Sequence, residues 1–473
     1  MTRTDPPPSP IAPAAAHPET AEGTDPSTGI GLPVDVLVIG GGPAGTTAAT
    51  FLARKGWKVA LLEKDVHPRF HIGESLLPMN LPILERLGVL EQVRAIGVYK
   101  AGADFPVHDP GHPADGTTHV FRFDRALDPK FGSAFQVRRS EFDQLLFEHA
   151  RGNGVDARER TKVTHIDFGD DGRPAQVLAT GLDGRALAFR PRYLVDASGR
   201  DTFLGSRLKL KKKNAAHQSA AIFSHFRGVA RRPGEEAGNI TVERFAHGWM
   251  WLIPLRDDVM SVGAVCFPEY LKTRSGDNET FLMDTLRATP SVWARMAGAE
   301  RIAPVHATGN YSYTCTRMHG PGWVMAGDAF AFIDPVFSSG VYLGMNGGEQ
   351  AAKTVDAILR DPSREAAEQR AMDRRLRRGL RYFSWFIYRF TTPVMEALFA
   401  QPRNTLQLEQ AVISMLAGDV FDNKAVRWRL RVFRLVYALT ALQLAPKALR
   451  GWLRRRRQVG ERFSGDTLQG GNP

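Results

Sequence analysis

Cysteine is nearly absent from this chain: only Cys266 and Cys315 occur among its 473 residues. Two cysteines cannot build a disulfide framework, and neither belongs to a Cys-x-x-Cys pair or lies beside clustered histidines. We therefore expect two buried, unreactive thiols, no metal site, and a protein of the reducing cytoplasm.

Long apolar runs are missing as well. The longest one near the C-terminus, Leu435–Ala445, falls short of the ~18–20 residues that a membrane span requires. Residues 1–33 are rich in Pro, Ala, Ser, Thr and Gly and lack the apolar core of a signal peptide. This composition predicts a disordered N-terminal tail.

The first ordered segment has the pattern of a βαβ unit. Val36–Ile39 is a continuous apolar run, as in a strand buried on both faces of a parallel sheet. A helical stretch at Thr46–Lys55 and a second apolar strand at Lys58–Leu62 follow. The second strand ends at Glu63, where a carboxylate can accept hydrogen bonds from a ribose hydroxyl.

The turn between the first strand and the helix matches the dinucleotide fingerprint G-x-G-x-x-G. Its residues are Gly40, Gly42, Pro43, Ala44 and Gly45. The first glycine permits the tight turn, the second lets the backbone approach a pyrophosphate, and the third lets the helix pack closely. The pyrophosphate then lies at the helix N-terminus, facing its N–H groups and dipole.

Two later segments favour FAD as the dinucleotide. Val195–Arg200 and Gly327–Ala329 each follow an apolar strand, and they resemble the second and third FAD motifs of the para-hydroxybenzoate-hydroxylase-like flavoproteins. The resemblance implies that Gly327 and Asp328 bind the cofactor, with Asp328 accepting a hydrogen bond from a ribityl hydroxyl. Gln136–Asp143 is similar to a third segment of that family, which places Arg139 near the cofactor. The alternative for Arg139 is a surface ion pair with Glu141 or Asp143.

The remaining pattern predicts an α/β fold in which a Rossmann-type FAD-binding domain is interleaved with an antiparallel-sheet substrate domain. We expect a helix at Glu141–Arg151 and a buried strand at Tyr193–Ala197. Residues 34–205 and 318–360 form the FAD-binding domain, and the alternating segment 206–317 forms the antiparallel sheet. Residues 361–473 form a basic helical C-terminal extension. Since no second G-x-G-x-x-G follows a strand, a separate flavin reductase is expected to deliver the reducing equivalents as FADH2.

Two motifs resemble those of the flavin-dependent halogenases. Trp249–Pro254 reads W-x-W-x-I-P, and Phe332–Gly340 reads F-x-x-P-x-x-S-x-G. In that family the two indoles, here Trp249 and Trp251, form a wall that keeps substrate away from the flavin. The backbone N–H groups at the positions of Ser339 and Gly340 lie beside the halide. The alternatives are two core tryptophans, and a glycine turn that contacts only the flavin ring.

The same resemblance extends to two further segments. His71–Pro78 is similar to the family's G-E-S/A loop over the flavin, so Glu74 and Ser75 are expected near the cofactor. Val98–Phe105 resembles the K-x-G-A-x-F segment, which makes Lys100 the candidate catalytic lysine that binds hypohalous acid or forms a haloamine. The alternative is a lysine whose stem is buried and whose head reaches water.

One departure narrows the expected substrate. Tryptophan halogenases carry a glutamate in the Pro-x-x-Ser stretch, where this chain has Phe337. The resemblance then implies chlorination or bromination of an electron-rich aromatic ring of phenol or pyrrole type, either free or bound to an acyl carrier protein. The reaction would proceed through a flavin hydroperoxide and hypohalous acid. The alternatives are an FAD-dependent aromatic monooxygenase, a prenyl or polyene reductase, and a flavin-binding protein without turnover.

Positive charge is concentrated near the C-terminus of a chain whose net charge is +12. Aromatic residues alternate there with many arginines, which include the run Arg454–Arg457. This pattern fits a helical cap with buried aromatics and solvated arginines. It also fits docking of an acidic carrier protein, or peripheral contact with an anionic membrane. Nucleic acid is not expected, because no recognition motif accompanies the charge.

Overall fold

The computed structural model describes residues 31–109, 112–129, 131–214, 218–309, 312–400 and 402–444. Most of the predicted N-terminal tail and the run Arg454–Arg457 therefore lie outside the described residues. Leu32 and Pro33, which the sequence assigned to the tail, belong instead to the first strand, β1 (Leu32–Ile39). They do so because β1 pairs in parallel with β10 (Ala186–Asp196) along its whole length, from Leu32 opposite Phe189 onward.

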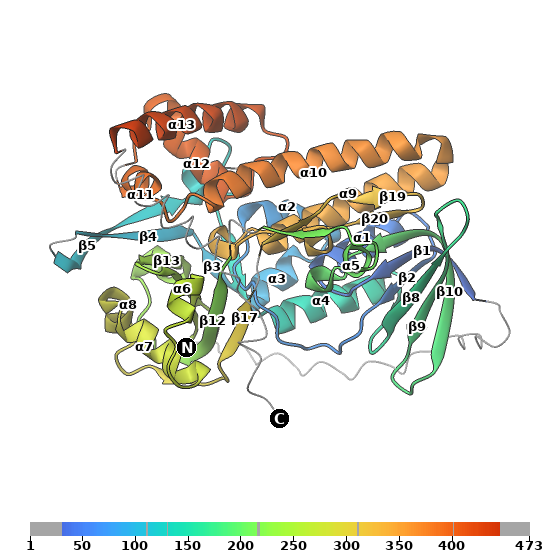
Figure 1. Cartoon of the computed structure of the whole chain (residues 1–473), viewed down its shortest axis with the longest axis horizontal. Helices are drawn as coiled ribbons and strands as arrows, with labels where there is room; N and C mark the ends of the chain where they lie inside the picture. Colours follow the sequence, from blue (N-terminus) through green and yellow to red (C-terminus); the bar gives the residue numbers. More distant parts are fainter. Residues whose placement is uncertain are drawn as a thin grey trace, which may run out of the picture.

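Two eight-stranded sheets organise the part of the chain that the structure describes (Figure 1). The first runs in the order β19-β20-β10-β1-β2-β7, and β9 and β8 extend it from the long strand β10. Its strands besides β1 and β10 are β2 (Val59–Leu62), β7 (Asp156–Arg158), β8 (Lys162–Phe168), β9 (Pro174–Thr180), β19 (His319–Gly320) and β20 (Trp323–Met325). The central pairings among β20, β10, β1, β2 and β7 are all parallel.

Three helices cover the parallel part of the first sheet. These are α1 (Pro43–Ala53), α4 (Arg139–Gly152) and α9 (Gly340–Arg360). Helix α1 packs against both α4 and α9. The close approach of α9 to α1 depends on the glycines of α9, because a Cβ atom on Gly348 would lie 2.2 Å from the carbonyl oxygen of Ala44 in α1.

The second sheet runs in the order β16-β12-β15-β14-β13-β4-β5, and β17 also pairs with β12. Its strands are β4 (Gly102–Asp109), β5 (His112–Arg122), β12 (Ala220–Arg227), β13 (Ile240–Phe245), β14 (Gly248–Pro254), β15 (Val259–Cys266), β16 (Glu300–Arg301) and β17 (His306–Gly309). All described pairs are antiparallel except β13 with β4. Strands β4 and β5 lie outside the range 206–317 expected for this sheet. They join it because Ile240 and Thr241 pair with Ala103 and Asp104.

Smaller elements complete these two layers. Helices α6 (Pro268–Leu271), α7 (Asn278–Arg287) and α8 (Pro290–Arg295) follow β15. They contribute Phe281, Leu282, Leu286 and Val292 to a second hydrophobic core, which they share with β12, β14 and β15. The remaining elements before α9 are α2 (Leu81–Leu87), α3 (Leu90–Ile96), α5 (Phe203–Arg207), β3 (Gly97–Lys100), β6 (Ala134–Val137), β11 (Lys211–Lys213), β18 (Tyr313–Cys315) and β21 (Ala331–Phe332). Cys266 and Cys315 are both buried and unpaired.

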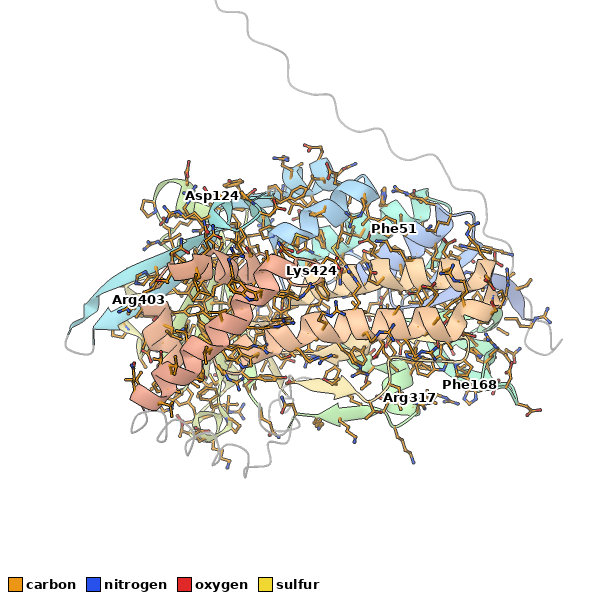
Figure 2. The ribbon with its side chains drawn as sticks, turned by 90° about the horizontal axis from the view of Figure 1, so that it is seen from above. Phe51, Asp124, Phe168, Arg317, Arg403 and Lys424 are labelled. Atoms are coloured by element: carbon orange, nitrogen blue, oxygen red, sulfur yellow. The ribbon has the colours of Figure 1, made fainter. Side chains whose placement is uncertain are left out.

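The C-terminal part is helical. It contains α10 (Glu365–Ile387), α11 (Pro393–Ala400), α12 (Leu408–Leu416) and α13 (Lys424–Gln443). Figure 2 shows α9 and α10 running side by side across the molecule, with α13 beginning near the labelled Lys424. Within the described ranges, no helix combines the length and the apolar character needed to cross a bilayer.

Candidate active site

A cavity of about 340 Å³ lies where β1, α1, α9 and the second sheet meet. It is lined by the glycine turn after β1, by the loop between β2 and α2, and by residues from β14 and the N-terminus of α9. Most of the residues singled out in the sequence line it, namely Gly40, Gly42, Pro43, Ala44, Glu63, Glu74, Ser75, Arg139, Trp249, Trp251, Asp328 and Gly340. The fold thus brings together parts of the chain that lie far apart in the sequence.

The glycine turn forms the end of the cavity nearest the parallel sheet. Gly40 has φ +101°, a conformation that side chains disfavour. A Cβ atom on Gly45 would lie 1.9 Å from the carbonyl oxygen of Gly40, so only glycine fits there. A Cβ atom on Gly42 would meet no atom within 4 Å, because this residue faces open space. The turn therefore has the bare backbone and free volume that a pyrophosphate needs.

Carboxylates occupy two positions along the cavity. Glu63 is buried and accepts hydrogen bonds from the backbone N–H groups of Gly41 (2.7 Å) and Asp65 (2.9 Å). Burial raises the pKa of Asp328 to about 6, while Arg200 and Arg139 act in the opposite direction. Both carboxylates retain lone pairs that can accept hydrogen bonds from sugar hydroxyls, so the donors and acceptors of this cavity suit FAD.

Arg139 forms an ion pair, but a buried one. Its Nε and Nη2 atoms each lie 2.8 Å from an oxygen of Asp143, and its Nη1 atom donates to the carbonyl oxygen of Ile72 at 2.6 Å. Arg139 is only 5% exposed, and the Arg139 guanidinium helps to hold the pKa of Asp143 low against the effect of burial. The ion pair between Arg139 and Asp143 is therefore buried, and it is not the surface ion pair considered as the alternative.

The two indoles lie on one face of β14 and line the cavity together. Their ring centroids are 5.8 Å apart, and both side chains are 4% exposed. The Nε1 atom of Trp251 donates to the Oγ atom of Ser261 at 3.1 Å. Gly263 faces Trp251 on the neighbouring strand, and a Cβ atom there would lie 2.4 Å from Cζ2 of this indole. The position of Trp251 thus depends on that glycine.

Lys100 is buried at the end of β3, with 1% of its surface exposed. Its Nζ atom donates to Oγ of Ser75 at 2.8 Å and to the carbonyl oxygen of Leu76 at 3.0 Å. Burial lowers the pKa of Lys100 to about 7, although Asp104 acts in the opposite direction. Its head group does not reach water, so the alternative of a solvent-exposed amine does not describe this residue.

A second, narrow cavity of about 10 Å³ adjoins Lys100. Its lining is almost entirely apolar and includes Phe105, Phe123, Val242 and Phe337. Ile240 and Ser338 line both this cavity and the large one. These two residues therefore form a shared wall between the large cavity and the lysine.

The shared wall is continuous with the start of α9. Ser338 has φ +55°, Ser339 is the N-cap residue, and the helix begins at Gly340. The first N–H groups of an α-helix have no acceptor within the helix, and the helix dipole makes this end favourable for an anion. Gly340 lines the large cavity, whereas the buried Ser339 is not among the residues found to line either one.

Several residues of the site carried no sequence signal. Nε2 of His225, from β12 in the second sheet, lies 2.8 Å from Oε1 of Glu74, so this contact joins the two layers. Arg69 lines the large cavity, 3.6 Å from Glu63. Unlike these two, Arg200 belongs to the segment Val195–Arg200 that resembles the second FAD motif, and it also lines the large cavity. The described residues contain no group of three or more His, Cys, Asp or Glu side chains placed to hold a metal ion.

Comparison with known proteins agrees with this geometry. The family model of the FAD binding domain matches residues 33–382. The chain is 36% identical over 333 residues to a tryptophan 2-halogenase of Chondromyces crocatus, a match that covers 68% of this chain and 61% of that enzyme. The chain thus spans less than two thirds of that relative's length.

Two further relatives match over more of their length. A 1H-pyrrole-2-carbonyl-(peptidyl-carrier protein) chlorinase of Pseudomonas fluorescens is 30% identical over 414 residues, covering 82% of this chain and 90% of that enzyme. The solved structure of a myxobacterial chondrochloren halogenase, a variant of FAD-dependent halogenases, has a TM-score of 0.71 at 30% identity and covers 88% of this chain and 91% of that one. The chain therefore belongs to the FAD-binding-domain family and, within it, to the flavin-dependent halogenases, which are FAD-dependent oxidoreductases.

Proposed function

We propose that this protein chlorinates or brominates an electron-rich aromatic ring of phenol or pyrrole type. The observation that carries the proposal is the buried Lys100 amine, separated from the large cavity only by a wall that includes Ile240 and Ser338. When bound as FADH2, the cofactor supplies, together with oxygen, the oxidation that converts halide to hypohalous acid. The reductase that reduces it is a separate protein.

The residues around the large cavity hold the cofactor in this proposal. Gly40, Gly42 and Gly45 give the pyrophosphate access to the N-terminus of α1, assisted by Pro43 and Ala44. Glu63 and Asp328 accept hydrogen bonds from sugar hydroxyls, and Gly327 makes the turn that presents Asp328. Arg139, Glu74 and Ser75 border the flavin. The indoles of Trp249 and Trp251 exclude the aromatic substrate from it.

Lys100 directs the halogen in this proposal. Halide approaches the N–H groups of Ser339 and Gly340 at the start of α9. Hypohalous acid then reaches the Lys100 amine, which hydrogen-bonds it or carries the halogen as a haloamine. The ring carbon takes the halogen as its bond to oxygen or nitrogen breaks, the ring loses a proton, and the oxygen leaves as water.

The lining of the lysine cavity supports an aromatic substrate. Phe337 occupies the position at which tryptophan halogenases carry a glutamate, and the cavity walls are apolar. A volume of about 10 Å³ is too small for a ring, so binding requires Phe337 or its neighbours to move. Phe337 packs against Phe390 at 5.4 Å between ring centroids, and Phe390 lies in the turn between α10 and α11.

Helix α13 is the proposed docking surface for an acidic carrier protein. One face of this helix exposes large apolar side chains, namely Trp428, Leu435, Leu439 and Leu442. Arginines flank this stripe, among them Arg431 and Arg434, and the chain carries a net charge of +12. An apolar stripe between cations suits an acidic partner with an apolar patch. The pyrrole chlorinase relative is named for a substrate on a peptidyl carrier protein, which supports this choice over a lipid surface.

The test is a halogenation assay with purified protein, FAD, a generic flavin reductase, NADH, oxygen, bromide and resorcinol. We expect a brominated product, identified by its isotope pattern, that persists with added catalase. Lys100→Ala should abolish the brominated product while FAD binding is retained. Lys353→Ala, a control at an exposed lysine, should leave the amount of product unchanged. A product with one added oxygen, or NADH oxidation without the reductase, would assign the protein to the aromatic monooxygenases instead. FADH2 oxidation that reduces the double bond of an added prenyl or polyene compound, without consuming oxygen, would assign it to the reductases.

A further inference from the structure

Arg244 is a half-buried cation next to the lysine cavity, and its Nε and Nη2 atoms are buried. It lies on β13, where side chains two residues apart point to the same face of the sheet. Ile240 and Val242 on that face both line the lysine cavity. Arg244 is the next residue of the same row, about 7 Å further along the strand.

The polar edge of Arg244 has no partner. Its Nε and Nη2 atoms are buried and make no hydrogen bond in the structure, and no ion pair involves this side chain within the described ranges. Burial lowers the pKa of Arg244 to about 10, although the carboxylates of Glu396 and Glu243 act in the opposite direction, so the side chain remains charged at neutral pH. Leaving buried N–H groups unsatisfied is costly, and stacking on an aromatic ring compensates only partly.

The free edge is the one that binds carboxylates elsewhere in this chain. Arg139 donates through Nε and Nη2 to both oxygens of Asp143, at 2.8 Å each. Arg86 donates through the same two atoms to both oxygens of Glu349, at 2.9 and 2.8 Å. In Arg244 the guanidinium lies 4.1 Å from the centroid of the Phe390 ring, which fixes the group and leaves this edge available.

Aromatic side chains connect Arg244 to the lysine. Phe390 contacts Phe337 and Phe105, with ring centroids 5.4 and 5.7 Å apart, and both of these line the lysine cavity. Phe399 of α11 lies 5.5 Å from the same guanidinium and also contacts Phe105. A movement of Phe337 or Phe390 that admits a substrate ring would therefore open onto Arg244.

We propose that Arg244 binds an oxyanion of the aromatic acceptor through its Nε and Nη2 atoms, and so holds the ring at Lys100. This inference rests on the proposed function. The oxyanion is a carboxylate on a free acceptor, or the phosphate of the phosphopantetheine arm of a carrier-bound one. Both present paired oxygens that match the planar edge of arginine.

The first arm of the test compares 3-hydroxybenzoate with its methyl ester in the bromination assay. Arg244→Gln should lower kcat/KM for the acid ten- to hundred-fold and change that for the ester less than threefold. Arg244→Lys keeps the charge but not the paired donors, so its kcat/KM for the acid should lie between those of the parent and Arg244→Gln. Arg287→Gln is the matched control, because Arg287 also stacks on an aromatic ring, that of Trp293, and lies on α7 away from the lysine cavity. FAD content and thermal midpoint establish that each variant folds.

The second arm distinguishes the two oxyanions. The 3-hydroxybenzoyl thioesters of pantetheine and of 4′-phosphopantetheine differ only in the phosphate. If the phosphate is the ligand, Arg244→Gln should reduce kcat/KM for the phosphorylated thioester alone and spare 3-hydroxybenzoate. The proposal would be overturned if Arg244→Gln changed kcat/KM equally for anionic and neutral acceptors, or changed it for none of them.

A binding measurement separates this inference from the proposed function. Calorimetric titration of the FAD-loaded protein with 3-hydroxybenzoate and with 4′-phosphopantetheine, without halide or reductant, requires no turnover. If the affinity for either ligand is at least tenfold weaker in Arg244→Gln, the result supports the oxyanion site, even if no variant halogenates any acceptor. If the protein halogenates, but neither the binding of these anions nor kcat/KM changes in Arg244→Gln, the proposed function stands and the oxyanion site is rejected.

Discussion

The Nζ atom of Lys100 lies 2.8 Å from the Oγ atom of Ser75, and this hydrogen bond joins the buried amine to the loop that lines the large cavity. The resemblance to known halogenases placed Ser75 at the cofactor. In the structure the same residue lines that cavity and also holds the lysine. The loop Gly73–Leu76 thus connects the cofactor site with the proposed site of halogen transfer.

Ser75→Ala should uncouple the reaction. The amine would keep only the carbonyl oxygen of Leu76 as acceptor, so its position in the apolar cavity would be less defined. We expect about tenfold less halogenated product per oxygen consumed, with FADH2 oxidation itself nearly unchanged. Product and oxygen are measured in the same reaction, and Ser75→Thr, which retains a hydroxyl, should recover most of the yield. Unchanged coupling in Ser75→Ala would show that this hydrogen bond does not position the lysine.

Lys100 should make stability depend on pH above neutrality. Its pKa is lowered to about 7 in the folded chain, whereas an unfolded lysine titrates near 10.4. Between these values the unfolded chain binds more protons, so this group makes the free energy of unfolding rise with pH, by up to about 1.4 kcal/mol per unit. Lys100→Met should remove that slope and be more stable than the parent below pH 7.

Urea unfolding of the FAD-free protein at several pH values from 6 to 9.5 provides the measurement. Lys353→Met, at an exposed lysine, should retain the parent slope. If Lys100→Met and the parent gave parallel curves, the amine would not be perturbed by burial.

Asp328→Asn should affect the apoprotein and the complex in opposite directions. Burial raises the pKa of Asp328 to about 6, so its charged form is unfavourable in the empty cavity above that pH. The variant without FAD should therefore melt at the same temperature as the parent or higher at pH 8. FAD affinity, followed by flavin fluorescence, should fall at least tenfold because a charged acceptor for a hydroxyl is lost. Asp284→Asn, on the exposed face of α7, is the control; a lower midpoint with unchanged affinity would refute the assigned role.

Gly263→Ala should displace Trp251. The new Cβ atom would lie 2.4 Å from Cζ2 of the indole and 2.4 Å from Cβ of Phe223, so one of them must shift. We expect a loss of about 1–3 kcal/mol in the free energy of unfolding, together with weaker FAD binding as the indole moves into the cavity. Gly152→Ala is the matched control, since a Cβ atom there meets nothing within 4 Å. Equal stability of the two variants would mean that the wall tolerates the extra methyl group.

The exposed face of α13 should matter for carrier-bound substrates only. Replacing both Leu439 and Leu442 by Ser removes two of the most exposed apolar side chains of that face. KM for a carrier-bound phenol should rise about tenfold and that for free resorcinol should not change. Cosedimentation with anionic vesicles is the competing measurement: if the double variant lost vesicle binding and retained carrier turnover, the face would serve a membrane.

The local motifs of the βαβ unit could be predicted from the sequence, but element boundaries could not. Helix α1 begins at Pro43 rather than Thr46, since proline is favoured in the first turn, where its missing N–H is not needed. Helix α9 begins at Gly340, whereas the sequence pattern predicts helix only from about Glu349 onward. Its glycines disfavour a helix by local propensity, yet they permit the close contact with α1 that the fold requires.

Contacts between distant segments were the part that the sequence could not predict. Strand β10 begins at Ala186 rather than Tyr193 because its first residues pair with β9. Strands β4 and β5 join the second sheet through a parallel pairing with β13, for which no local pattern exists. His225 reaches Glu74 from that sheet, and Arg244 reaches the aromatic residues around Lys100 from the same sheet, so neither belongs to a contiguous motif.

The side chains around the cavity beside Lys100 come from two parts of the chain. Phe105 and Phe337 lie within residues 33–382, the region that the model of the FAD binding domain matches, whereas Phe390 and Phe399, which pack on Phe105, lie beyond it. Under the proposed function, exchanging the segment after Tyr382 between relatives should therefore change the preference for the acceptor. The residues that line the large cavity and the Lys100 amine would stay the same in such an exchange.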